Sequence, residues 1–173
     1  MQITEKIDKH QIRELLSKGW LTHDAMWFYN VYKDMGIEKA NKMNLAAIEA
    51  MSAIEVRRYL KALGYPKDTV FTSFKDFSDF FEKAFSILQA DFMDTQYTIP
   101  GHNRVKWKWN TCFAHTGLTH LGVIGQYQCG VLLRVQTWLK TLGIRYTMEP
   151  EITGCLMHSR GACEGIFRFY FEE

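Results

Sequence analysis

The first half of the chain carries apolar residues at the spacing of an α-helix. This pattern predicts helices over residues 7–20, 23–35, 37–63 and 73–88. Asp8 and Gln11 suit a capping box for the first helix, which Gly19 is expected to end. Thr22 would cap the second helix. The fourth begins at Ser73 and carries phenylalanines along one side, so this part of the chain is expected to be mainly helical.

After residue 92 the pattern changes to alternation. It predicts strands over 97–99 and 104–113 joined through 100–103, a helix over 124–142, and strands over 144–148 and 165–171. In the second strand Val105, Trp107 and Trp109 share one face, and Cys112 lies on the other. Cys129 would lie opposite the apolar side of the 124–142 helix.

The order of these elements favours an α+β fold. Helices come first, followed by a hairpin, a long helix and two more strands, without regular strand–helix alternation. We therefore expect long N-terminal helices packed with a small antiparallel β-sheet and a further long helix. A chain of 173 residues suits a single domain over 1–173. Its first part, 1–92, would be mainly helical, and 93–173 would hold the sheet, a helix and a cysteine and histidine cluster.

Composition indicates a globular chain and argues against two kinds of partner. Hydrophobic residues make up 47% and aromatic residues 14%, which supplies a core and is compatible with a homodimer. The formal net charge is only +2 with both signs mixed, unlike a nucleic-acid-binding face. No stretch reaches the length of a membrane span, and the first ten residues lack a secretory signal pattern. We expect a cytoplasmic location.

All four cysteines lie in the last third of the chain, where a reducing compartment makes a disulfide framework unlikely to be their role. Thiolate and imidazole are ligands that zinc prefers, and four thiolates commonly hold an iron–sulfur cluster. Two cysteine–histidine pairs show a two-residue gap that is common in paired ligands. The candidate metal ligands are Cys112, Cys129, Cys155, Cys163, His115 and His158. The alternative is that the thiols are buried without a ligand, as free cysteines often are.

Cys155 is also the best local candidate for a nucleophile. It follows Gly154 and precedes His158 and Arg160, which could provide a base and a cation. The alternative, which we favour, is a loop whose histidine is exposed. Closeness in sequence does not establish the geometry that catalysis requires.

Three further candidates lie outside the cysteine-rich region or at its end. His23 and Asp24 could act together in proton transfer, with Trp27 as a flat wall for a substrate. A helix N-terminus would explain Asp24 equally well. Asn44 interrupts an apolar stripe and, if buried, must bond to the backbone or a ligand, because an unpartnered amide costs about 1–3 kcal/mol. Arg168 near the last cysteine is a weaker binding candidate, since charges on the outer face of a strand are common.

Three short motifs together resemble a known group of proteins. They are LTHDAMWF at 21–28, Cys112 followed by YQC at 127–129, and CEGIFRF at 163–169. The combination resembles a little-characterised bacterial and archaeal family related to L-2-amino-thiazoline-4-carboxylate hydrolases and to the 4-vinyl-reductase-type small-molecule-binding domain. The resemblance implies an α+β fold that encloses a small-molecule pocket, in some relatives with a metal held by cysteine and histidine. A complete catalytic set for a hydrolase cannot be placed on this sequence.

Two hypotheses follow. In the first, the chain is a small-molecule-binding protein of hydrolase-like type that acts on a small polar metabolite. A cysteine and histidine metal site would then activate water or substrate, His23 and Asp24 would assist proton transfer, and Trp27, Asn44 and Arg168 would bind the substrate. In the second, it is a non-catalytic sensing or structural domain with zinc, an iron–sulfur cluster or unliganded cysteines. Small-molecule binding is common to most of these alternatives and is the interpretation we favour.

Overall fold

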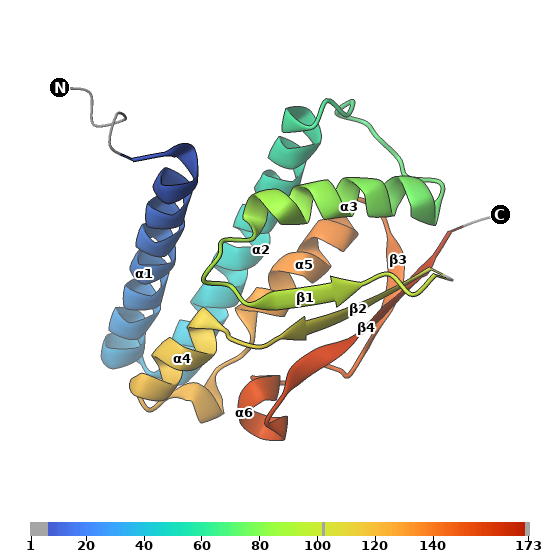
Figure 1. Ribbon diagram of the computed structural model, residues 1–173. Coiled ribbons are helices and arrows are strands. Elements are labelled where there is room, and N and C mark those ends of the chain that lie inside the picture. Colours follow the sequence, from blue (N-terminus) through green and yellow to red (C-terminus); the bar gives the residue numbers. More distant parts are fainter. Residues whose placement is uncertain (1–6, 102, 172–173) are drawn as a thin grey trace.

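The computed structural model describes residues 7–101 and 103–171 of the chain and confirms the α+β fold (Figure 1). Three helices come first, and strands and shorter helices follow. In chain order the elements are α1 (Lys9–Met35), α2 (Ile37–Ala62), α3 (Phe74–Leu88), β1 (Thr95–Thr98), β2 (Arg104–Trp109), α4 (Phe113–His120), the 3₁₀ turn η2 (Ile124–Gln126), α5 (Gly130–Thr141), β3 (Arg145–Glu149), α6 (Leu156–Arg160) and β4 (Cys163–Tyr170).

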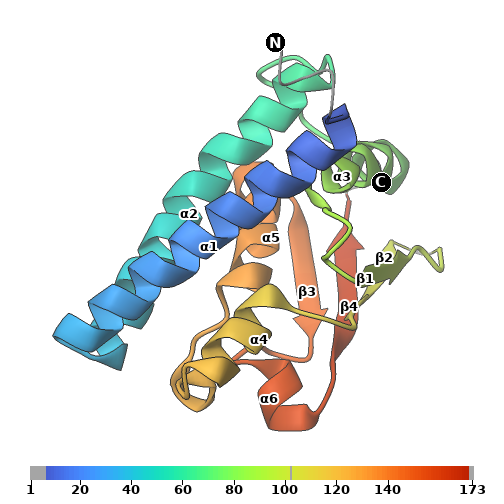
Figure 2. The ribbon, with the colours of Figure 1, turned by 60° about the vertical axis from the view of Figure 1, so that its left-hand side comes forward.

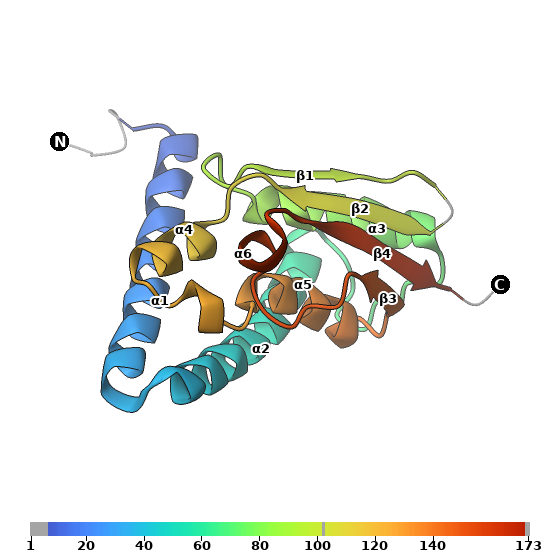
Figure 3. The ribbon, with the colours of Figure 1, turned by 90° about the horizontal axis from the view of Figure 1, so that it is seen from below.

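The four strands form one antiparallel sheet in the order β1-β2-β4-β3. Figures 2 and 3 show the long helices on one side of this sheet. Side chains alternate along each strand, so Val105 and Phe167 are buried while Lys106 and Lys108 are exposed. The sheet therefore contributes one face to the core and leaves the other open.

The core has two parts. The larger lies between the sheet and α2, α3 and α5, and its most deeply buried large side chains include Trp138, Phe77 and Phe80. The smaller joins the middle of α1 and the start of α2 to α4 and η2, around Phe28 and Tyr127, whose ring centroids lie 5.6 Å apart. Both candidate sites described below lie between these two parts.

The N-terminal half differs from the prediction at one point. Residues 7–20 and 23–35 were expected to form two helices, but Gly19 and Thr22 lie inside the single helix α1. A glycine costs a helix only about 1 kcal/mol, and packing of α1 along α2 on both sides of Gly19 outweighs that cost. The capping box of Asp8 and Gln11 is confirmed, as are α2 and the start of α3 at Ser73.

The segments around the cysteines differ more. The predicted strand 104–113 ends at Trp109, and Phe113 begins α4 instead. The predicted helix 124–142 begins only at Gly130, so the expectation that Cys129 lies opposite an apolar stripe was wrong. The short helices α4 and α6 were not predicted. Helices of eight and five residues contain too few repeats of the apolar spacing to be distinguished from strands or loops.

Some predictions remain outside what this structure tests. Residues 1–6 lie outside the described part, and the prediction that the chain lacks a signal pattern partly depends on them. Residue 102, in the predicted link between two strands, also lies outside it. The homodimer stays a prediction. No helix in the described part of the chain combines the length and apolar character that crossing a membrane requires.

Two glycine substitutions should affect stability in opposite directions. A Cβ atom at Gly165 would overlap the Glu149 carbonyl oxygen and the Trp107 ring, so Gly165→Ala should lower the free energy of unfolding by about 1–3 kcal/mol. A Cβ atom at Gly19 meets nothing within 4 Å, so Gly19→Ala should raise it by about 0.5–1 kcal/mol. Urea unfolding of both variants tests this, and a stable Gly165→Ala protein would contradict the strand packing described here.

Candidate functional site

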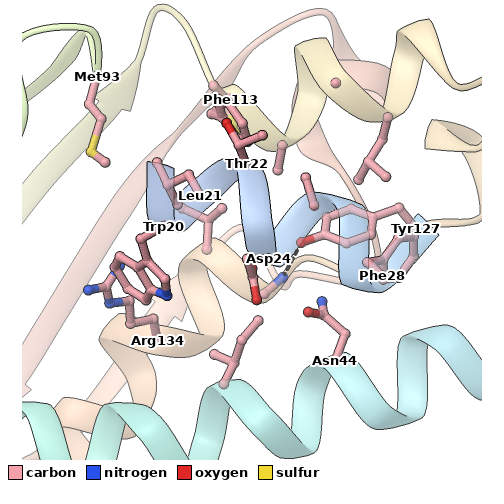
Figure 4. Close-up of a pocket in the computed structure, with 18 of the residues that line it drawn as sticks. Trp20, Leu21, Thr22, Asp24, Phe28, Asn44, Met93, Phe113, Tyr127 and Arg134 are labelled. Carbon is pink, nitrogen blue, oxygen red and sulfur yellow. Dashed lines mark hydrogen bonds between the residues drawn. The ribbon is translucent and has the colours of Figure 1, made fainter. Parts of the chain in front are cut away.

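A cavity of about 360 Å³ lies between α1, α2, α4 and α5, closed at one side by the segment around Met93 and the end of β2. Most of its wall is apolar. Figure 4 shows Trp20 and Arg134 side by side at one end, Phe28 and Tyr127 at the other, and Asp24 and Asn44 between them. The apolar lining includes Leu21, Ala25, Phe28, Ala47, Ile48, Met51, Phe85, Leu88, Met93, Phe113, Leu118, Leu121, Val131 and Val135.

Helix α1 presents one face to the cavity. Trp20, Asp24 and Phe28 are four residues apart, so they lie above one another on that face. His23 and Trp27 are exposed and do not line the cavity. The structure therefore does not bring His23 and Asp24 together in this cavity, because neighbouring side chains in a helix point about 100° apart.

Arg134 is anchored at the Trp20 end of the cavity. Its Nε donates a hydrogen bond of 2.8 Å to Glu55 Oε2, and its Nη2 donates to Glu55 Oε1. The indole Nε1 of Trp138 donates to the same carboxylate at 3.0 Å. The guanidinium carbon lies 4.8 Å from the centre of the Trp20 ring, a cation–π contact. Glu55 thus neutralises Arg134, and Trp20 and Arg134 together form a flat, polarisable wall.

Asp24 is the acidic side chain that lines this cavity. Its pKa is raised, chiefly because burial disfavours the carboxylate, although His23 and Arg134 partly offset this. No described residue donates a hydrogen bond to it. Asp24 lines the cavity and is also exposed to solvent. Its carboxyl group therefore stands at the apolar wall with its acceptor oxygens free for a ligand or water.

Asn44 and Tyr127 lie beside it, near the start of α5. Asn44 is buried within the apolar stripe of α2, and the Tyr127 hydroxyl accepts from Gly130 N at 3.1 Å. The amide nitrogen of Asn44 also lies close to Gly130. Burial raises the pKa of Tyr127. The expectation that Asn44 bonds to the backbone or to a ligand stays a prediction.

The four cysteines come together in a second, smaller cavity of about 20 Å³. Three of them precede helices: Cys112 is the N-cap residue of α4, Cys129 of α5 and Cys155 of α6. Cys163 begins β4 opposite Trp109. His115 also lines this cavity, whereas His158 is exposed, lies against Gly125 and lines neither cavity.

The buried thiols differ from reactive thiolates in their protonation. Burial raises the pKa of Cys112, that of Cys129 to about 11 and that of Cys163 to about 12, and the neighbouring cysteines add to each shift. The backbone N–H groups of Ala114 and His115 partly counteract the rise in the pKa of Cys112, although its side chain forms no capping hydrogen bond. These three thiols are therefore protonated at neutral pH unless a cation lies between them.

The two cavities share a wall. Trp109, Cys112, Ala114, Tyr127 and Val131 line both. A molecule in the large cavity would consequently lie beside the thiols, separated from them by little more than the Cys112 and Tyr127 side chains.

Sequence reasoning missed Asn41, which positions Cys129. The buried Asn41 amide donates to the Gln126 carbonyl at 2.8 Å and accepts from Gln128 N at 3.1 Å. These bonds hold the turn before α5 against α2. Asn41 lies three residues before Asn44 on the same helix, and this second buried amide was the available signal. Trp20 and Arg134 were also missed, because nothing local marks residues that meet only in the fold.

Two other charged groups lie away from both cavities. Arg168 is on the open face of the sheet, 3.6 Å from Glu149 Oε2, so it is not placed to bind a ligand in either cavity. His10, Glu14 and Asp91 cluster at the surface, where His10 Nε2 lies 2.9 Å from Asp91 Oδ2 and Glu14 accepts from Asp91 N. This group ties α1 to the segment after α3, which explains it without a metal.

The chain was compared with known families and proteins. The model of a family described as "Family of unknown function (DUF6125)" matches residues 4–128, more than half of the chain. The match covers α1 to η2 and includes Cys112, while Cys129, Cys155 and Cys163 follow it. Neither the curated proteins nor the solved structures gave a significant match. The chain therefore belongs to the family of unknown function DUF6125.

Proposed function

We propose that this protein binds a small molecule with a largely apolar body and one cationic or hydrogen-bond-donating group in the large cavity. The observation that carries the proposal is the free Asp24 carboxyl group in an apolar space of about 360 Å³. Small-molecule sites typically enclose some 300–1,000 Å³ and combine apolar walls with a few polar groups.

The lining indicates how such a ligand would lie. Trp20 and Arg134 offer a flat surface to an aromatic or unsaturated group. Asp24 would accept hydrogen bonds from the donor group, and an unpaired carboxylate in an apolar wall gains most from a cation. The ligand therefore needs both features at once, which distinguishes it from a simple lipid tail.

The same arrangement favours binding over the hydrolysis that the resemblance implies. An L-2-amino-thiazoline-4-carboxylate substrate carries a carboxylate, which Asp24 would repel. Arg134 already pairs with Glu55 and does not complement that group. His23, expected to share proton transfer with Asp24, lies outside the cavity lining. The hydrolase stays a prediction, and the binding domain is the function we propose.

A cavity-filling pair of variants tests the location of the ligand. The neutral dye N-phenyl-1-naphthylamine should bind the wild-type protein with a saturable rise in fluorescence. Ala47→Trp places an indole in the cavity and should weaken binding by about tenfold or more, which corresponds to ~1.4 kcal/mol. Ala50→Trp is the matched control on the exposed side of α2 and should bind as the wild type does. Equal binding by both variants would place the dye elsewhere.

Two competitors that share a ring but differ in charge test the role of Asp24. 1-Naphthylmethylamine and 1-naphthalenemethanol share a ring, but only the amine is cationic. As pH rises through the raised pKa of Asp24, the carboxylate forms and the amine should displace the dye more effectively, whereas the alcohol should not change. Asp24→Asn should remove the pH dependence and the preference for the amine. An unchanged preference in that variant would exclude Asp24 as the recognition group.

Asp24 should also reduce stability in the absence of ligand. Because its pKa is raised in the folded chain, folding is favoured where Asp24 is protonated, and that contribution is lost as pH rises through the raised pKa. Asp24→Asn should therefore melt at a higher temperature than the wild type at pH 7, and the difference should shrink as pH falls toward 4. Thermal unfolding followed by circular dichroism measures it, and a lower melting temperature for the variant at pH 7 would contradict it.

A further inference from the structure

All four cysteines of the chain converge on one small cavity, although they lie on four separate elements. Cys112 ends the segment after β2, Cys129 and Cys155 precede α5 and α6, and Cys163 begins β4. Independent apolar fillers would be expected at unrelated places in the core. Their convergence indicates that the thiols act as a set.

The positions of three of the sulfurs suit anionic ligands. Cys112 and Cys129 are the N-cap residues of α4 and α5, and Cys155 is that of α6. The N–H groups of a helix's first turn lack partners within the helix, and the helix dipole favours negative charge there. None of these cysteine side chains forms a capping hydrogen bond. A metal-bound thiolate would gain more from this placement than a neutral core thiol.

The gap between the thiols is small. About 20 Å³ remains among these four side chains, roughly the space that one water molecule needs. A metal centre larger than a single ion therefore requires the cysteine side chains to move apart.

The spacing of the sulfurs distinguishes two kinds of metal centre. A tetrahedral zinc ion with Zn–S bonds of about 2.3 Å would hold sulfurs about 3.8 Å apart. Within the described part of the chain, the one group of three or more ligand atoms that all lie within 4.8 Å is His10, Glu14 and Asp91. No three of the four sulfurs are that close. A cluster, whose iron atoms stand between the thiolates, needs this wider arrangement.

We propose that Cys112, Cys129, Cys155 and Cys163 together bind an iron–sulfur cluster. Each thiol loses its proton to solvent as its sulfur bonds to iron, and rotation of the cysteine side chains widens the gap to admit the cluster. The site is independent of the ligand proposed for the large cavity, but it shares the Cys112 and Tyr127 wall with it. A ligand in the large cavity therefore lies next to the cluster.

The experiment is metal analysis of the full chain, purified without oxygen and then supplied with ferrous iron, ferric iron and sulfide, so that a mixed-valent cluster forms without a separate oxidant. Wild-type protein should hold iron and acid-labile sulfide in equal amounts and show charge-transfer absorption in the visible range. Cys129→Ser and Cys163→Ser should each lose most of both. His158→Ala, in the same cysteine-rich region but outside the cavity lining, should keep them. Thermal unfolding followed by circular dichroism reports whether each variant has folded.

Alkylation of the wild-type protein gives a second test that needs no variant. The chain has only four cysteines, so mass spectrometry after iodoacetamide treatment reports on these residues alone. The loaded protein should react more slowly than protein stripped with a chelator. Stoichiometric zinc without iron, no metal after reconstitution, equal alkylation rates, or full iron content in the folded serine variants would each overturn the proposal.

Discussion

The close contact between α2 and the start of α5 positions both candidate sites. At Gly130 a Cβ atom would overlap the end of the Ile48 side chain and approach the Tyr127 hydroxyl and the Asn44 amide, so a larger residue there would displace Ile48 where α5 begins beside α2. One turn further along, Arg134 and Glu55 form a two-point ion pair that is nearly buried, their side chains being 12% and 14% exposed. Removing one partner of such a pair lowers stability strongly, because it leaves the other charge buried and unpaired. The pair therefore fixes the alignment of the two helices.

This alignment determines which groups face one another. It brings Cys129 to the end of α5 that points at α4 and α6, and it places Arg134 under Trp20 of α1. The buried Asn41 reinforces it by holding the chain just before Cys129. The large cavity and the thiol cavity consequently lie on opposite sides of a shared wall around the start of α5.

Burial acts in the same direction on five groups near that wall. The pKa values of Asp24, Tyr127 and the three thiols are all raised, with desolvation as the largest cause in each. The interior therefore favours neutral, protonated forms. A cationic ligand beside Asp24 or a metal centre between the thiols would reverse this, which gives both proposals the same physical basis: each site gains from positive charge that the chain itself does not supply.

The sequence predicts the α+β class, α2, α3 and the approximate strands because these features rest on regular spacing over many residues. It also identifies the cysteines and Asn44 by residue type. It does not predict that Asp24 lines the cavity while His23 does not, because the side of α1 that packs against the other helices is set by tertiary contacts that the local sequence does not show. The prediction that Arg168 binds a substrate is not supported for a similar reason. The sequence shows the motif that contains Arg168, but it does not show which face of the sheet is left open.

The proposed cysteine site has no cysteine–cysteine spacing motif in the sequence. Known four-thiolate sites are recognised by short gaps between cysteines, which arise when one loop supplies two ligands. Here each sulfur comes from the end of a different element, so no such gap exists in the chain. What the four positions share is structural: three cap helices and the fourth begins a strand, and each is a point at which the backbone changes direction toward the same cavity. A pattern of cysteines at predicted element starts, rather than at fixed spacing, is therefore the signal that corresponds to this kind of site.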